Sequence, residues 1–251
     1  MENNISVTIV GCGSIGSRLA MKLAENEVTE FLLMDNEILL PENAIRHLCP
    51  LKDAVLLANK VDLVKEILLN KFPKIQCSTS IEDILVYLHR GGNDFSRYKA
   101  LISCVGNLAI ERRLDFSAKH KIINSPIIYL WVEPYAIAGH MLYIPPSRAG
   151  EYKSFFNTQG DFLFSVLKNL YSFSKREAGC QTSFVPYSSV DSDRFVSEAG
   201  KAIIDLMKNN HENECILYTW LEDLKKAYTL GYSINDIYMD DMPFSVVRKV
   251  L

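Results

Sequence analysis

The sequence contains no C-x-x-C pair, although six cysteines are scattered along its 251 residues. A zinc clip or a thioredoxin-like redox site would need cysteines paired at that spacing, so neither kind of site is indicated. Isolated cysteines are usually small buried thiols, and we expect most of the six to be buried and reduced. They are Cys12, Cys49, Cys77, Cys104, Cys180 and Cys215.

An excess of positive charge is also missing, since 27 Lys and Arg oppose 30 Asp and Glu and the net charge is −3. This balance gives no electrostatic basis for binding nucleic acid or an anionic membrane. The first four residues carry no basic run typical of a secretory signal, and the apolar stretch 127–135 is too short to cross a bilayer. A single-domain protein over residues 1–251, located in the cytoplasm, is the simplest interpretation.

Short β-branched runs alternate with segments of helical periodicity, and this alternation predicts an α/β fold. The expected arrangement is Rossmann-like: a mixed, mostly parallel sheet with helices on both faces and a late antiparallel hairpin. Strands are predicted at 5–10, 30–35, 74–79, 99–105, 127–132, 136–144 and 215–220. Helices are predicted at 14–25, 53–69, 81–88, 108–120, 191–209 and 221–228.

Between the hairpin and the late helix, the periodicity fades over a crossover segment at about 145–186. One further helix is expected within it, near 161–173. Long irregular segments inside compact domains tend to carry function, so the crossover segment is a candidate part of the functional site.

The first strand runs into a G-x-G-x-x-G turn made by Gly11, Gly13 and Gly16. Such a turn lets the backbone approach a phosphate, and the free N–H groups of the following helix favour an anion. Asp35 ends the second strand about twenty residues further on, where a carboxylate can bond a ribose hydroxyl. Together these residues predict a nucleotide site, and they leave open whether the nucleotide is NAD(P) or ATP.

Asn43, Arg46 and Lys60 favour ATP over a nicotinamide cofactor. A triphosphate needs fixed cations at its β and γ groups and one near the α-phosphate, where charge develops during nucleotidyl transfer. A dehydrogenase has little use for an asparagine, an arginine and a lysine in these places. Considered singly, Arg46 is best interpreted as a surface charge and Lys60 as a solvated helix residue. Because both follow Asp35 in this order, phosphate binding becomes the favoured interpretation.

Over roughly residues 5–210, this order resembles the ThiF/MoeB and ubiquitin-activating-enzyme adenylation family. The family pattern is a glycine turn, an acid, a second acid two residues later, an N-x-x-R-(Q/H) box and a helix lysine. The resemblance implies that Asp35 holds the ribose, while Asn43, Arg46 and Lys60 bind phosphates. The matching residues are Gly11, Gly13, Gly16, Asp35, Glu37, Asn43, Arg46, His47 and Lys60, with Asn107 from the family's D-x-x-D-N segment.

Gly106 departs from this pattern, because the family has an acid there that helps to hold Mg²⁺. ATP and Mg²⁺ remain the implied cofactors, since Mg²⁺ keeps several waters and needs few protein carboxylates. Zinc-binding cysteine pairs are absent too, and the chain begins directly at the first strand. The resemblance is therefore nearest to a divergent bacterial ubiquitin-like-conjugation branch. It implies a homodimer and a conjugating-enzyme-like partner or fused domain, and it leaves open a longer parent fusion.

In family members that go beyond adenylation, a cysteine on the crossover segment takes the substrate as a thioester. Cys180 is the candidate, because it lies in a polar, glycine-preceded stretch, whereas Cys104 and Cys215 fall on apolar strands. Lys175 and Arg176 are close enough in sequence to lower its pKa. The alternative, to which the sequence gives equal weight, is that Cys180 has a purely structural role.

The sequence thus predicts an adenylyltransferase that uses ATP to activate the C-terminal carboxylate of a ubiquitin-like or other small protein. Its expected catalytic residues are Arg46, Lys60 and Cys180. A catalytically weakened scaffold that keeps the fold for partner docking is one alternative, and Gly106 favours it. An NAD(P)-dependent oxidoreductase is the other, and the phosphate-binding set disfavours it.

Overall fold

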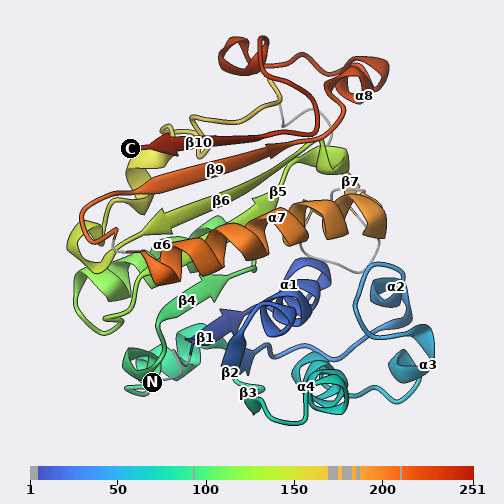
Figure 1. Ribbon diagram of the computed structural model, residues 1–251, viewed down its shortest axis with the longest axis vertical. Coiled ribbons are helices and arrows are strands. Elements are labelled where there is room, and N and C mark those ends of the chain that lie inside the picture. Colours follow the sequence, from blue (N-terminus) through green and yellow to red (C-terminus); the bar gives the residue numbers. More distant parts are fainter. Residues whose placement is uncertain (1–4, 93, 169–174, 177–182, 185–186, 210) are drawn as a thin grey trace.

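The computed structural model describes residues 5–92, 94–168, 175–176, 183–184, 187–209 and 211–251. Within them, one mixed sheet runs through the molecule in the order β10-β9-β6-β5-β4-β1-β2-β3 (Figure 1). Its strands are β1 (Ile5–Val10), β2 (Val28–Met34), β3 (Gln76–Ser80), β4 (Ala100–Ser103), β5 (Ile127–Val132), β6 (Ala138–Ile144), β9 (Ile216–Leu221) and β10 (Val246–Val250). A separate pair is formed by β7 (Lys175–Arg176) and β8 (Ser183–Phe184).

The first five strands of the main sheet are parallel, and β6, β9 and β10 are antiparallel to their neighbours. The chain builds outward from β1 to β3 and then returns to place β4 on the other side of β1. The loops after β1 and β4 therefore diverge, and open α/β sheets bind ligands at such a switch point. All six residues of β1 are buried, as expected for a strand covered on both faces.

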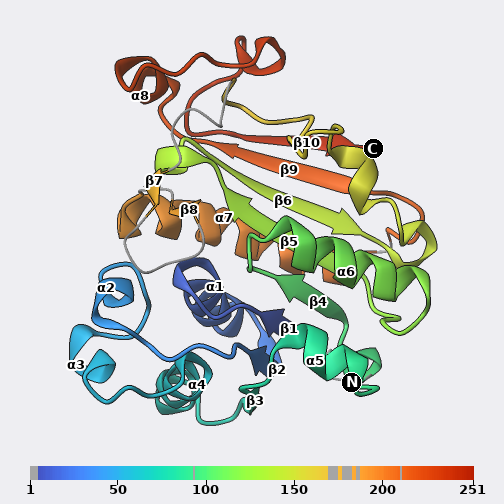
Figure 2. The same cartoon turned by 180° about the vertical axis from the view of Figure 1, so that it is seen from behind.

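Helices cover both faces of the sheet, as Figures 1 and 2 show from opposite sides. One face carries α1 (Ser14–Glu25), α4 (Lys60–Lys71) and α7 (Ser189–Lys208), which share one apolar core. The other face carries α5 (Ile84–His89) and α6 (Leu108–Lys119) over a second core. Short helices α2 (Pro41–Ala44) and α3 (Leu51–Ala54) connect β2 to α4, and α8 (Leu224–Thr229) follows β9. In the described part of the chain, no helix is long and apolar enough to span a bilayer.

These elements confirm the predicted fold class, a Rossmann-like, mostly parallel sheet with helices on both faces and a late antiparallel hairpin. β5 and β6 form that hairpin, joined by a 3-10 turn in which Tyr135 and Ala136 have positive φ. β1 and α1 have the predicted bounds. α7 begins two residues earlier than predicted, because the Ser188 hydroxyl caps it by accepting from the Asp191 N–H.

The single helix predicted over 53–69 is wrong, because two helices, α3 and α4, occupy this stretch with a break between them. The break has a tertiary cause. The Leu39 N–H donates to the Ala58 carbonyl at 2.9 Å, and the Lys60 N–H donates to the Glu37 carbonyl at 3.1 Å. This pairing brings the start of α4 beside the chain that leaves β2, so Lys60 becomes the first residue of a helix instead of an interior one.

The helix predicted near 161–173 is also wrong over the residues that the structure describes there, 161–168. Phe162 forms a β-bridge with Phe156, and Leu167 forms one with Ile234. The edge strand β10 was not predicted. Its exposed and half-buried residues alternate over only five positions, and a pattern that short carries a weak periodic signal.

Candidate functional site

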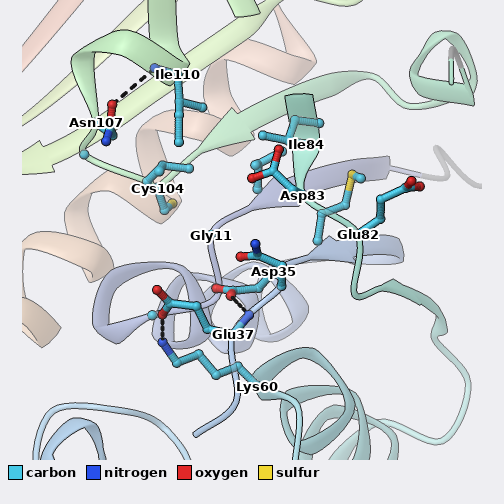
Figure 3. Close-up of a pocket in the computed structure, with 16 residues that line it drawn as sticks. Gly11, Asp35, Glu37, Lys60, Glu82, Asp83, Ile84, Cys104, Asn107 and Ile110 are labelled. Atoms are coloured by element: carbon cyan, nitrogen blue, oxygen red, sulfur yellow. Dashed lines mark hydrogen bonds and ion pairs between the residues drawn. The ribbon is translucent and has the colours of Figure 1, made fainter. Parts of the chain in front are cut away.

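A cavity of about 390 Å³ opens at the carboxyl ends of β1, β2 and β4, which is the switch point of the sheet (Figure 3). Its volume lies within the range of small-molecule sites. Five stretches contribute to its wall: the glycine turn, the end of β2, the start of α4, the β3–α5 loop and the β4–α6 loop. The lining residues are Val10, Gly11, Gly13, Met34, Asp35, Asn36, Glu37, Lys60, Glu82, Asp83, Ile84, Cys104, Val105, Gly106, Asn107 and Ile110.

The three glycines of the turn differ in what an added Cβ would meet. Gly11 has φ +87°, and a Cβ there would lie 3.1 Å from the Cys104 carbonyl carbon. Gly16 lies in α1 against the turn, and its Cβ would lie 1.9 Å from the Gly11 carbonyl oxygen. An added Cβ at Gly13 would meet no atom within 4 Å. Packing therefore requires Gly16, whereas Gly13 borders open space that a phosphate could enter.

Two backbone N–H groups fix the Asp35 carboxylate just after β2. Its Oδ2 accepts from Cys12 in the glycine turn at 2.7 Å, and its Oδ1 accepts from Glu37 at 2.9 Å. Burial raises the pKa of the Asp35 carboxyl, and the nearby charge of Lys60 opposes that shift. The acid is thus tied to the turn and presents an acceptor at the cavity wall, as ribose binding requires.

Lys60 is only 5% exposed and lines the cavity from the start of α4. Its Nζ is ion-paired with Glu37, whose side chain is 67% exposed. Figure 3 shows these two side chains meeting at one end of the site, on the same side as Asp35. A buried ammonium group needs a negative partner, and a phosphate in the cavity would offer Lys60 a second one.

Among the predicted nucleotide-binding residues, all of which the structure describes, Asn43, Arg46 and Gly16 do not line the cavity. The Asn43 Oδ1 accepts from the Leu40 N–H at 3.3 Å at the start of α2. The Arg46 guanidinium stacks on the Tyr187 ring, with 5.1 Å between its Cζ and the ring centroid. The predicted residues that the structure does bring together at the cavity are Gly11, Gly13, Asp35, Glu37, Lys60 and Asn107.

His47 is buried against the glycine turn. Its Nδ1 accepts from the Cys49 N–H at 3.1 Å, so the ring proton lies on Nε2, which donates to the Cys12 carbonyl at 2.6 Å. Burial lowers the pKa of His47 to about 4, which keeps the ring neutral. The Cys12 residue is therefore held at both ends, at its N–H by Asp35 and at its carbonyl by His47.

Sequence reasoning missed Glu82, Asp83 and Ile84, which line the cavity from the loop before α5. The Asp83 side chain caps α5, and Glu82 is ion-paired with Arg90. The strand order could have indicated these residues. Because β3 is parallel to β2, both strands end at the same edge of the sheet, so the loop after β3 lies beside the end of β2.

The loop after β4 supplies another side of the cavity. The Asn107 Oδ1 caps α6 by accepting from the N–H groups of Ala109 and Ile110 at 3.0 and 3.2 Å. Gly106 has φ +62°, and an added Cβ there would meet no atom within 4 Å. The position where the resemblance leads us to expect an acid is therefore a glycine with room for a side chain.

Cys180 lies outside the described residues. Burial raises the pKa of every thiol that the structure does describe. None of those five is therefore the low-pKa thiol that nucleophilic catalysis needs. They are the free cysteines Cys12, Cys49 and Cys215, which are buried, and Cys77 and Cys104, which are half-buried.

The model of the ThiF family matches residues 3–213 of this chain. Among solved structures, E. coli MccB with AMPCPP and MccA is 16% identical over 99% of this chain and 64% of its own length, with a TM-score of 0.60. PaaA is 17% identical over 98% of this chain and 64% of its own, with a TM-score of 0.55. No curated protein matches the chain. The chain thus spans less than two thirds of these solved structures, and the likeness is one of fold.

Proposed function

Because the chain belongs to the ThiF family, we propose that it is an ATP-dependent adenylating enzyme. In the proposed reaction, the C-terminal carboxylate of a ubiquitin-like or other small protein attacks the α-phosphate of ATP. A bond forms between carboxylate oxygen and phosphorus, the bond to pyrophosphate breaks, and an acyl-adenylate results. The meeting of the glycine turn, Asp35 and Lys60 around one cavity carries this proposal. E. coli MccB has been solved with ATP and with MccA, which supports ligands of the same kind.

The ribose and the phosphates of the nucleotide each have candidate partners in this arrangement. The Asp35 oxygens, already oriented by two N–H groups, would accept from the ribose hydroxyls. The N-terminus of α1, where Gly13 borders open space, favours a phosphate. Lys60 would exchange its exposed partner Glu37 for a phosphate, and Arg46 would add a positive charge near the reacting α-phosphate.

Mg²⁺ fits the donor chemistry of this site only as an ion held largely by phosphates and water, since the described residues include no group of three or more metal-ligating side chains. Asp35 is assigned to the ribose, Asp83 caps α5 through its Oδ1, and Glu82 is paired with Arg90. Glu37, mostly exposed at the Lys60 end, would become available to the ion once Lys60 pairs with a phosphate. Bound there, Mg²⁺ would neutralise phosphate charge.

ATP–pyrophosphate exchange with candidate C-terminal peptides tests the proposal. Exchange should appear with a suitable free carboxylate, and Lys60→Ala and Arg46→Ala should each lower it by at least about tenfold, because each removes a fixed charge from the transition state. Lys52→Ala and Arg112→Ala are matched controls, since both side chains are exposed and neither lines the cavity. Exchange that survives the loss of Arg46 unchanged would refute the assigned mechanism.

We also propose a second step on Cys180, in which its thiolate attacks the acyl carbonyl and AMP leaves. The raised thiol pKa values of the five described cysteines support Cys180 as the remaining candidate. A thioester would appear as a conjugate that a reducing agent cleaves. Cys180→Ser should give a conjugate that resists reduction, and Cys180→Ala should give none. Transfer to a conjugating-enzyme-like partner, homodimerisation and a cytoplasmic location remain predictions from the sequence.

Gly106 is the observation that favours a second candidate function, a scaffold with weakened ATP turnover. The site has room for a side chain, and aspartate tolerates a positive φ better than most residues. If exchange appears only after Gly106→Asp, the scaffold is the better description. If the natural chain catalyses exchange and Gly106→Asp does not increase the rate, the enzyme is the better description.

A further inference from the structure

Tyr187 lies between the crossover segment and α7, and it contacts two groups near the proposed phosphate site. Its hydroxyl is hydrogen-bonded to the Oγ of Ser14, the first residue of α1. Its ring carries the Arg46 guanidinium at 5.1 Å from the centroid. One side chain thus contacts both the start of α1 and a predicted phosphate-binding arginine, and neither contact is local in sequence.

The backbone of the same arginine is also attached to α7. Arg18, on α1, donates from Nε to the Arg46 carbonyl at 2.9 Å and from Nη2 to the His47 carbonyl at 3.3 Å. Its Nη1 donates to both carboxylate oxygens of Asp193 in α7, at 2.7 and 2.8 Å. Arg46 is therefore held at both ends, by Tyr187 at its guanidinium and through Arg18 at its carbonyl.

This arrangement has an electrostatic consequence. The N-terminus of α1 favours an anion through its free N–H groups and its dipole. A guanidinium stacked on an aromatic ring keeps its full charge and its in-plane donors, while the ring limits its rotation. Because Tyr187 contacts Arg46 and Ser14 together, it sets the position of that charge relative to the helix N-terminus.

We propose that Tyr187, just before α7, is a positioning residue that holds Arg46 beside the N-terminus of α1 and so strengthens ATP binding. The proposal rests on the proposed function, since it requires nucleotide phosphates at this turn. Tyr187 does not line the cavity. The proposed role is therefore indirect and runs through Arg46 and Ser14.

A double-mutant cycle in ATP affinity tests this role, measured by displacement of a fluorescent ATP analogue. Tyr187→Ala should weaken ATP binding about fivefold to tenfold in the natural chain but only about twofold to threefold in an Arg46→Ala background, where only the hydroxyl's bond to Ser14 is left to lose. Tyr187→Phe keeps the ring and removes one hydrogen bond, so it should weaken binding about twofold to threefold. That smaller loss should vanish in a Ser14→Ala background.

Phe244→Ala is the matched control, because it also removes an aromatic ring that carries an arginine. The Arg194 Cζ lies 5.6 Å from the centroid of the Phe244 ring, and neither residue lines the cavity. It should leave ATP affinity unchanged. Equal losses for Tyr187→Ala with and without Arg46 would overturn the proposal. If Tyr187→Ala does not fold, the Tyr187→Phe and Ser14→Ala cycle still decides it, and additive losses there would count against it. A natural chain that binds no ATP would overturn the proposed function itself, and this role with it.

Discussion

At the residue scale, Gly13 and Gly16 belong to one turn but differ in what a methyl group would meet. Gly16→Ala would place its Cβ against the Gly11 carbonyl oxygen, so it should lower the free energy of unfolding by about 2–3 kcal/mol or more. Gly13→Ala should change stability by less than about 1 kcal/mol and should instead weaken ATP binding. Urea denaturation and ATP titration of both variants would measure the difference, and equal destabilisation would contradict the steric argument.

His47 should make stability depend on pH. Its pKa falls from an ordinary 6.5 to about 4 in the fold, mainly through burial, so between these values the unfolded chain binds more protons than the folded one. Stability from this group is therefore complete above about pH 6.5 and is lost as the pH falls toward 4, by about 1–3 kcal/mol in all.

The matched variant for this prediction is His47→Gln, whose amide can donate to the Cys12 carbonyl but does not titrate. Glu111 titrates in an overlapping range with the opposite sign, because burial raises its pKa to about 7. The difference between the two stability curves isolates His47. Parallel curves from pH 4 to 6.5 would contradict its assigned neutral state.

At the element scale, Glu133 attaches the crossover segment to the β5–β6 hairpin. Its buried carboxylate accepts from the N–H groups of Val166 and Leu167 at 2.6 and 2.8 Å and is bonded to His140 Nε2 at 2.7 Å. Glu133→Ala should lower the free energy of unfolding by about 3–5 kcal/mol, because it leaves buried donors without an acceptor. Glu133→Gln should cost less, since one acceptor oxygen remains.

Glu198 provides the control for this prediction. It forms an exposed pair with Lys201 on α7, and Glu198→Ala should cost less than about 1 kcal/mol. Limited proteolysis should also cut the crossover segment of Glu133→Ala faster than that of the natural chain. A cost for Glu133→Ala no larger than that of the control would show that the carboxylate does not anchor the segment.

At the scale of the whole molecule, ATP should raise the melting temperature and NADH should not. A ligand at one hundred times its dissociation constant stabilises the folded state by about 2.7 kcal/mol. For a chain of this size, that corresponds to a rise of roughly 5–10 °C. Differential scanning fluorimetry with each nucleotide measures this, and a rise with NADH alone would favour the oxidoreductase alternative.

The parts of the fold that the sequence predicted are those in which local pattern and burial coincide. β1 is buried along its whole length and α1 carries one apolar side, so both have the predicted bounds. The prediction failed at 53–69 and at 161–168, where contacts between segments that are not neighbours in sequence decide the structure. These contacts are the backbone hydrogen bonds Leu39–Ala58 and Lys60–Glu37 and the bridge Leu167–Ile234. No local periodicity reports such partners.

For the site, the sequence by itself determined that the glycine turn and Asp35 would meet, because each follows a strand of a parallel sheet. Lys60 was expected there from its order after Asp35 and the family resemblance, and its place at the start of α4 was decided by the tertiary structure. Only the tertiary structure decided that Arg46 lies on Tyr187, outside the cavity wall. The packing of α7 against α1 sets that position, and the contacts that produce it join residues more than a hundred positions apart.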